Sequence, residues 1–239
     1  MAYQSAYNMN YQILLCLILF SLGLLLPLPS HSADPSPLQD FCVADLDSSL
    51  FINGFPCKNP DNVSSQDFFA NGFQQSPGEF NIFDVNVTRQ DVHRFPGLNT
   101  LGLSMNRVVL KPGGLNAPHV HPRASELALV MDGKLFVGLV TTGNVFYWKI
   151  VTSGELFVIP PGLVHFQLNI GHENARFFAS FNSQNPGIQF APLALFNSTP
   201  SIPDLVLSKA FQVNQSIIEL IKSRFATVST VSTVLKSSY

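Results

Sequence analysis

The sequence predicts an all-β fold, an antiparallel sandwich or barrel, with helices only near its C-terminus. Short apolar runs bounded by Gly, Pro or Asn follow one another from about Phe68 to Asn182. No stretch with helical periodicity separates these runs. No internal repeat is visible and the pattern His-x-His occurs once, which indicates one such domain rather than two.

The expected strands either alternate apolar and polar residues or form the short apolar runs of buried strands. Turns are expected between them at Lys111–Gly114, Met131–Lys134, Thr142–Asn144 and Pro160–Gly162. Of these, Asp132-Gly133 is the strongest signal for a two-residue β-hairpin. The strands are Leu101–Leu110, Glu126–Met131, Lys134–Thr141, Val145–Val151, Glu155–Ile159, His165–Ile170 and Arg176–Asn182.

Two helices are expected after the last strand. Pro203-Asp204 opens the first, Leu205–Phe211, because proline is favoured in the first turn of a helix. Asn214 is expected to cap the second helix, which carries an apolar stripe. This stripe must be buried, either on its own barrel or against a neighbouring subunit. The stripe consists of Ile217, Ile218, Ile221 and Phe225.

The N-terminus carries a strongly apolar segment, residues 13–28, followed by the small-residue stretch Ser30-His31-Ser32-Ala33. This pattern predicts a secretory signal peptide, residues 1–32, cut after Ser32 or Ala33. Residues 1–12 hold no Lys or Arg, so the usual positive start is missing and a signal anchor is the alternative. No other stretch approaches a transmembrane length, and no membrane contact is expected of the mature chain.

The three cysteines agree with secretion. Cys16 lies in the apolar segment and would leave with it, so Cys42 and Cys57 form an even pair in the mature chain. A bridge between them would close a loop of about fifteen residues and add roughly 3 kcal/mol of stability. Two free buried thiols are the alternative, which suits a reducing compartment better than an oxidising one.

Four Asn-x-Ser/Thr sequons are glycosylation candidates if the chain is secreted and the asparagines are exposed. At Asn214 the expected helix cap competes with this role. The sequons begin at Asn62, Asn86, Asn197 and Asn214.

Charge and composition limit the possible functions. The formal net charge is −2, only 12% of residues are charged, and no basic cluster occurs. Nucleic acid binding therefore has no electrostatic basis. Apolar residues make up 46% of the chain and include 21 Phe, enough for a sizeable core.

The strongest chemical signal lies in the segment Gly113–Glu126. His119 and His121 are two residues apart, so an extended strand projects both imidazoles from one face. Pro122 ends or bends the strand before Glu126. His165 follows a second strand and a Pro-Pro-Gly turn that bring it back toward them. Three imidazoles and one carboxylate can hold a divalent transition metal with open positions, although these donors alone do not select the ion.

The two histidine segments resemble the two characteristic boxes of the cupin superfamily. Pro-His-Val-His-Pro-Arg-Ala-Ser-Glu, ending at Glu126, is similar to the germins and germin-like proteins of plants. The resemblance runs from Leu38-Gln-Asp-Phe-Cys-Val-Ala-Asp-Leu through Gly54-Phe-Pro-Cys-Lys and Phe95-Pro-Gly-Leu-Asn to the C-terminal helices.

This resemblance implies a domain plan. It comprises a disulfide-tied arm at residues 33–65, a cupin jelly-roll barrel at 66–200, helices at 201–226 and a Ser/Thr/Val tail at 227–239. Cys42 and Cys57 match the disulfide of the family. The helices would clasp a neighbouring subunit in a homohexamer, a trimer of dimers.

The resemblance also implies the metal and a substrate site. Manganese would be held by His119, His121, Glu126 and His165. In oxalate-degrading germins, the asparagines that match Asn106 and Asn116 are thought to bind the substrate.

Other interpretations of these asparagines stay open. Asn116 can instead be a turn residue before Pro118. Asn106 lies in an expected strand, where asparagine is depleted and needs another reason to be present. Arg123 is interpreted as structural, supporting a carboxylate or a turn, and Glu155 as neutral to function.

Three classes of function follow from this resemblance. The first is a manganese oxidoreductase of the apoplast or cell wall, a superoxide dismutase or oxalate oxidase that produces hydrogen peroxide. The second is a non-enzymatic, metal-binding wall or receptor-like glycoprotein, since fold and metal do not guarantee turnover. The third is hydrolysis by a metal-activated water.

Overall fold

The computed structural model describes residues 15, 17, 39–50 and 54–226. The chain divides into two compact units, residues 1–32 and 33–239. The predicted signal peptide, apart from Leu15 and Leu17, and the predicted tail lie outside the described residues. In the described part of the chain, no helix is long and apolar enough to cross a membrane.

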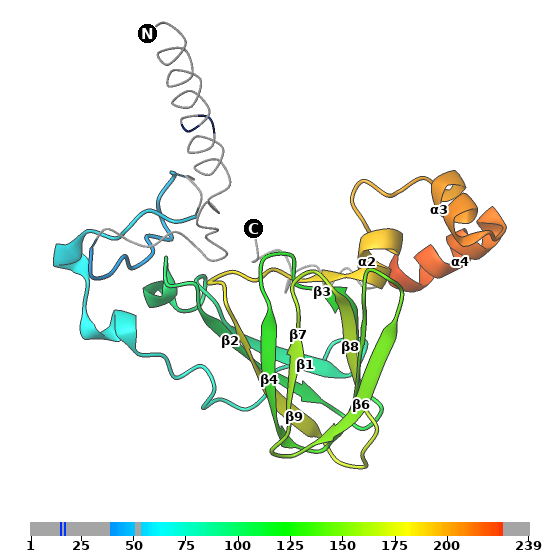
Figure 1. Cartoon of the computed structure of the whole chain (residues 1–239), viewed down its shortest axis with the longest axis horizontal. Helices are drawn as coiled ribbons and strands as arrows, with labels where there is room; N and C mark the ends of the chain where they lie inside the picture. The colour runs from blue at the N-terminus through cyan, green and yellow to red at the C-terminus, as the bar shows by residue number, and fades with distance from the viewer. Residues whose placement is uncertain (1–14, 16, 18–38, 51–53, 227–239) are drawn as a thin grey trace, which may run out of the picture. The chain divides into compact units, whose positions relative to one another are not determined.

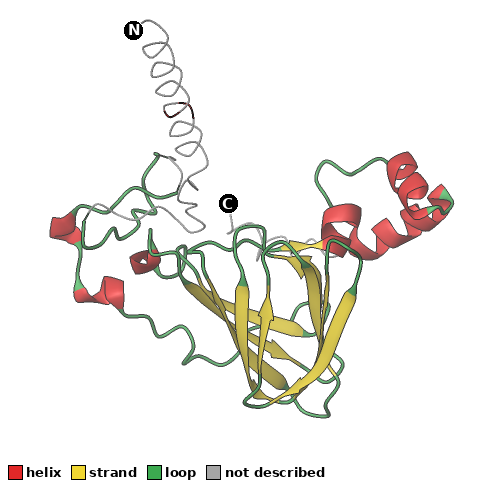
Figure 2. Cartoon of the chain, viewed as in Figure 1, coloured by secondary structure: helices red, strands yellow, loops and turns green. Residues whose placement is uncertain are grey.

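Two five-stranded antiparallel sheets form a barrel (Figures 1 and 2). This confirms the predicted all-β architecture. In order across the first sheet lie β1 (Val85–Gln90), β2 (Ser104–Leu110), β9 (Ala175–Phe181), β4 (Glu126–Asp132) and β7 (Leu156–Ile159). The second sheet contains β10 (Gln189–Phe190), β3 (Leu115–Val120), β8 (Val164–Asn169), β5 (Lys134–Val140) and β6 (Phe146–Thr152).

The seven expected strands correspond to β2 and to β4 through β9. The expected segment Leu101–Leu110 begins too early, because β2 starts only at Ser104. β1, β3 and β10 are not among the seven expected strands, although the spacing of His119 and His121 predicts an extended segment where β3 lies. β1 and β3 carry asparagine or proline among their apolar residues, and β10 has two residues.

The expected hairpin at Asp132-Gly133 is wrong. β4 and β5 flank this turn but belong to different sheets, so the turn carries the chain across the barrel. Gly133 has a φ of 87°, and a Cβ there would lie 2.6 Å from Ala175 Cα. Gly133 therefore lies in a connection between the sheets where a side chain would clash with β9. Among these turns, the one that joins paired strands is at Thr142–Asn144, between β5 and β6.

The hydrophobic core lies between the sheets. Along some strands, the inward-facing residues change from apolar in the core to polar at one end of the barrel. Along β4 the inward residues are Glu126, Ala128 and Val130, and on β9 Phe181, Ala179 and Phe177 lie opposite them in register. Glu126 therefore sits one inward position from an apolar layer. The buried core contains Val85, Val108, Leu110, Ala124, Ala128, Val130, Leu135, Val137, Val151, Ala175, Phe177, Ala179 and Phe181.

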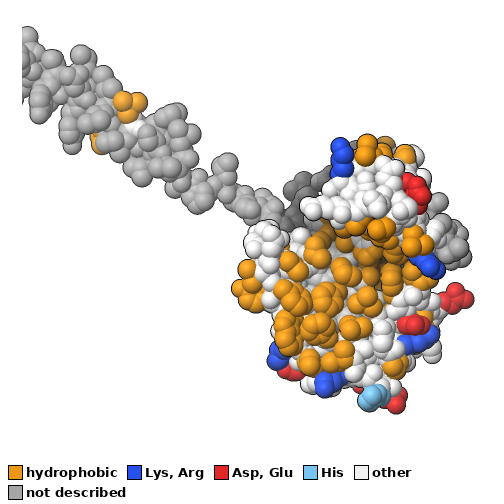
Figure 3. Space-filling view, turned by 90° about the vertical axis from the view of Figure 1, so that its right-hand side faces the viewer, with side chains coloured by type: hydrophobic (Ala, Val, Ile, Leu, Met, Phe, Trp, Pro, Cys, Tyr) orange, Lys and Arg blue, Asp and Glu red, His pale blue; other side chains and the backbone are white. Residues whose placement is uncertain are grey.

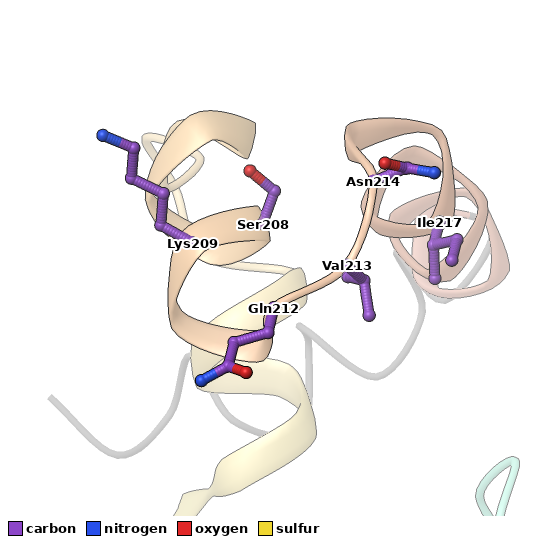
Figure 4. Close-up of a pocket in the computed structure, with 6 residues that line it drawn as sticks. All are labelled: Ser208, Lys209, Gln212, Val213, Asn214 and Ile217. Carbon is purple, nitrogen blue, oxygen red and sulfur yellow. The ribbon is translucent and has the colours of Figure 1, made fainter.

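Up to residue 226, where the described part of the chain ends, three α-helices follow the barrel: α2 (Ala191–Phe196), α3 (Asp204–Phe211) and α4 (Gln215–Ala226). α2 was not expected; it packs on β3, β10 and α4, while α3 packs on α4. Ile218 of the stripe on α4 is fully buried, but Ile217 remains 43% exposed. Between α3 and α4 lies an open hollow (Figure 4), lined by Ser208, Lys209, Gln212, Val213, Asn214 and Ile217.

The N-terminal arm is tied together as expected, because Cys42 and Cys57 form a disulfide. Three short 3-10 helices, η1 (Pro60–Asn62), η2 (Ser65–Phe68) and η3 (Pro96–Leu98), accompany it. Asn99 connects the arm to the barrel, since its side-chain Nδ2 donates to the Phe55 carbonyl at 3.0 Å. Its Oδ1 accepts a hydrogen bond from Gln184 at 3.1 Å.

Candidate metal centre

Four buried side chains meet inside one end of the barrel. His119 lies on β3, His121 just beyond it, Glu126 at the start of β4 and His165 on β8. One donor atom from each lies within 4.8 Å of those of the other three. At most 5% of any of these residues is exposed. The cluster therefore brings together the four residues that the sequence singled out as ligand candidates.

A bulge in β3 explains why Asn116 and His119, three residues apart, both point into the barrel. Asn116 lies opposite Gln167 and His119 opposite His165, and the register shifts by one residue between these pairs. Without the shift, residues three apart would face opposite sides of the sheet. The bulge therefore turns both Asn116 and His119 into the barrel. Pro118, which cannot donate to a ladder, lies within this irregular stretch.

Backbone carbonyls orient the three imidazoles. The Nδ1 atoms of His119, His121 and His165 lie 2.8, 2.6 and 2.8 Å from the carbonyl oxygens of Ala117, Gly187 and Leu163, respectively. A carbonyl only accepts, so each Nδ1 carries the proton and donates it. Nε2 of each ring is then the atom available to a metal, as is usual for metal-binding histidines.

The electrostatics of the cluster fit a cation. Glu126 Oε2 lies 3.2 Å from His121 Nε2 and 3.1 Å from His165 Nε2. When each Nδ1 holds its proton, a neutral ring presents a lone pair to this oxygen. A proton or a metal cation must lie between such atoms, because two acceptors repel each other.

The pKa shifts point the same way. Burial, followed by repulsion from the other two imidazoles, holds the pKa of His119 well below its usual range, so the ring stays neutral. Burial alone would raise the pKa of Glu126, but hydrogen bonds that His121 and His165 donate when their Nε2 atoms are protonated as well lower it well below its usual range. A metal cation would take the place of these two protons. A neutral imidazole beside an ionised carboxylate is the state that a metal ion needs.

Amide side chains line the barrel beside the cluster. Asn106 on β2 is 8% exposed, shares the inward face with Val108, and has a buried Oδ1 without a partner in the described structure. Asn116 Nδ2 donates to Gln167 Oε1 at 2.7 Å, so Asn116 does not act merely as a turn residue. Gln167 is fully buried and its Nε2 has no partner among the described residues.

Sequence reasoning missed Gln167. Its position two residues after His165 on β8 was the available signal, because alternation places both side chains on the inward face. The structure thus adds a third amide to the pair Asn106 and Asn116. Unpaired polar atoms in a buried site are costly, so these amides are available to bind a ligand or an ordered water.

Arg123 and Glu155 lie outside the cluster. Arg123 supports a turn rather than a carboxylate: its Nε donates to the Asn185 carbonyl at 2.7 Å. Glu155 is on the surface, where hydrogen bonds from Lys149 and then from Thr152 lower its pKa to about 2.

Three of the four sequon asparagines, Asn62, Asn197 and Asn214, are exposed. Asn86 is half-buried, and its Nδ2 donates to the Glu79 carbonyl at 2.9 Å.

Comparison with known proteins identifies the family to which this chain belongs. The cupin family matches residues 70–219. Germin-like protein 3-3 of Oryza sativa subsp. japonica is 52% identical, with 80% of this chain and 86% of the relative covered. The rhicadhesin receptor of Pisum sativum is also 52% identical, with 79% and 87% covered.

The barrel also superposes on a solved structure of recombinant oxalate oxidase in complex with glycolate. The TM-score is 0.80 and the identity 48%, with 82% of this chain and all of that chain (100%) covered. The chain therefore belongs to the cupin family and, within it, to the germin and germin-like proteins.

Proposed function

We propose that this protein is a secreted, manganese-dependent oxidoreductase that produces hydrogen peroxide, of the superoxide dismutase or oxalate oxidase type. The buried cluster of three histidines and one glutamate carries this proposal. His119, His121, Glu126 and His165 would hold the ion through three Nε2 atoms and one carboxylate oxygen. Manganese would supply one-electron redox chemistry and open coordination positions.

The amides support oxalate in particular. A small dicarboxylate needs hydrogen-bond donors in a buried site, and Gln167 Nε2 is such a donor without a partner in the described structure. Asn106 on β2 and Asn116 on β3 are both buried in the barrel, on different sheets. These amides would orient the carboxylate, because an amide donates through nitrogen without adding a charge. Phe181 and Phe190 pack against the imidazoles of His121 and His119 and limit the access of water.

The apoplast or cell wall is the proposed location. The disulfide between Cys42 and Cys57 suits an oxidising compartment. Glycosylation is proposed at the exposed asparagines Asn62, Asn197 and Asn214; Asn86 would first have to release the Glu79 carbonyl.

We also propose that the chain works as a homohexamer, a trimer of dimers. The outer face of β5, β6 and β8 is strongly apolar and forms an orange field in Figure 3. Phe146 is 45% exposed and Trp148 60%. On this face the ring of Phe166 stacks on Phe146 and also contacts Phe136. Exposed apolar patches of this kind mark interaction surfaces.

A receptor-like, non-enzymatic role is the second candidate. One specific observation favours it: a relative that is a rhicadhesin receptor matches this chain as well as germin-like proteins do. In such a role the metal centre would stabilise the barrel rather than turn over a substrate.

One experiment separates these functions. The secreted protein is purified, its metals are measured, and superoxide dismutation and peroxide release from oxalate are assayed together. About one manganese per chain with either activity is the expected result. Bound manganese with neither activity would favour the receptor-like role. The double variant H119A/H121A should lose the metal, and an unchanged manganese content in it would contradict the ligand assignment.

A further inference from the structure

Three successive backbone carbonyls face the segment that carries His121. The Asn185 carbonyl accepts from Arg123 Nε at 2.7 Å, and the Pro186 carbonyl accepts from Arg123 N at 3.2 Å. The Gly187 carbonyl lies 2.6 Å from His121 Nδ1 and accepts its proton. The loop at residues 182–187 follows β9 and has no side chain in the metal cluster, yet it determines how one imidazole is held.

The Arg123 side chain lies directly on this loop. Although Arg123 is exposed, a Cβ placed on Gly187 would be only 2.7 Å from its Nη2 and 3.0 Å from its Cζ. Gly187 also has a φ of 65°, a conformation that other residues rarely adopt. The guanidinium therefore covers the glycine whose carbonyl orients His121.

The beginning of the same loop is held by other parts of the barrel. Ser104 Oγ donates to the Ser183 carbonyl at 2.7 Å, and Val92 N donates to the Gln184 carbonyl at 2.9 Å. Ser125 N donates to Asn182 Oδ1 at 2.8 Å. Residues 182–184 thus have anchors that do not depend on Arg123. In the part nearest to His121, residues 185–187, Asn185 N donates to Ser183 Oγ at 3.1 Å, and the Arg123 side chain adds the bond to the Asn185 carbonyl and the contact over Gly187.

We propose that Arg123 is a positioning residue for the metal ligand His121. Its guanidinium donates to the Asn185 carbonyl and lies against Gly187, which keeps the Gly187 carbonyl where it accepts from His121 Nδ1 and keeps Nε2 directed at the centre. The inference rests on the proposed metal centre and deepens it. Partners that orient a ligand in this way typically change metal affinity by about 10- to 100-fold.

The test uses the full-length secreted protein, stripped of metal by a chelator and titrated with Mn²⁺ or Co²⁺. R123Q should bind both ions at least about tenfold more weakly than wild type. G187A should show a similar loss, because its new Cβ displaces the guanidinium. R176Q is the matched control: it also removes an exposed arginine, but one that pairs with Asp132. It should bind as wild type does.

A second background shows whether Arg123 acts through His121. In H121A, which retains the other three donors, adding R123Q should cause no further loss of affinity. Wild-type metal affinity in R123Q or in G187A would overturn the proposal. The proposal would also fail if R123Q lowered the metal affinity of H121A as much as it lowers that of the wild-type protein. A wild-type protein that binds neither ion would refute the metal centre itself, a result distinct from these.

Discussion

At the residue scale, the site depends on polar atoms that have no partner inside the protein. Asn106 Oδ1 and Gln167 Nε2 are buried without a hydrogen bond in the described structure. Such atoms cost roughly 1–3 kcal/mol of stability each, which a packed core would not tolerate without a reason. We propose that Gln167 Nε2 donates to a ligand beside the metal. Asn106 Oδ1 is an acceptor and would bind a donor such as an ordered water, whereas Asn106 Nδ2 is the atom that could donate to a carboxylate.

Replacing Asn106 with alanine should abolish most oxalate turnover while manganese stays bound. The change removes an amide near the ligand but none of the four metal donors. The loss of one positioned hydrogen-bonding group typically lowers the rate about 10²- to 10³-fold. Peroxide release from oxalate and elemental analysis of the same sample measure both effects.

Superoxide dismutation serves as the internal control for this variant, because it requires only an open metal position and should survive. If the wild-type protein dismutes superoxide but releases no peroxide from oxalate, the amides are structural and the oxalate proposal fails.

At the element scale, the turns that connect the two sheets restrict which residues can occupy them, because they require unusual backbone conformations or leave no room for a side chain. Lys111–Gly114, Asp132-Gly133 and Pro160–Gly162 each carry the chain from one sheet to the other. Gly113, Gly133 and Gly162 in these turns adopt positive φ values, and a Cβ on Gly133 would lie 2.6 Å from Ala175 Cα of β9. The same sequence signal, Asp-Gly, thus serves a crossover here instead of a hairpin.

Two glycine variants separate conformation from crowding. G133A and G154A both place alanine at a positive φ, 87° and 84° respectively, which costs about 1–2 kcal/mol. Only at Gly133 does the new Cβ meet another strand, at 2.6 Å, whereas nothing lies within 4 Å of it at Gly154. G133A should therefore lose about 1–3 kcal/mol more stability than G154A. Urea unfolding of both variants measures the difference, and equal losses would show that β9 yields freely.

At the scale of the whole molecule, large apolar side chains stay exposed on the barrel and on the helices. On the first sheet, Leu127, Leu156 and Val158 are 51%, 62% and 60% exposed. Ile217 and Leu220 of α4 are 43% and 56% exposed, even though Ile218 is buried by the neighbouring helices. The helices satisfy only part of their apolar stripe within their own subunit, which supports the proposed assembly.

Truncation before Ser201 should convert the proposed hexamer into smaller or aggregated species. The deletion removes α3 and α4 together with their exposed apolar side chains, while leaving the barrel strands intact. Light scattering of the full-length and truncated proteins gives the masses. A full-length protein that runs as a monomer would contradict the proposed assembly. If the truncated protein still forms a hexamer, the interface lies on the sheet faces and not on α3 and α4.

The sequence by itself determined the all-β class, seven of the strands and the four residues of the cluster. Alternation and turn chemistry are local, so His119 and His121 could be placed on one face from their spacing alone. Cys42 and Cys57 could be paired because the chain offers few alternatives.

Only the tertiary structure decided which strands are neighbours and which carbonyls orient the imidazoles. The bulge that turns Asn116 inward depends on the register of β3 with β8. The Gly187 carbonyl meets His121 from a loop that is 66 residues away in the sequence. Such contacts depend on how distant segments pack, and the hydrophobic pattern of either segment does not encode them.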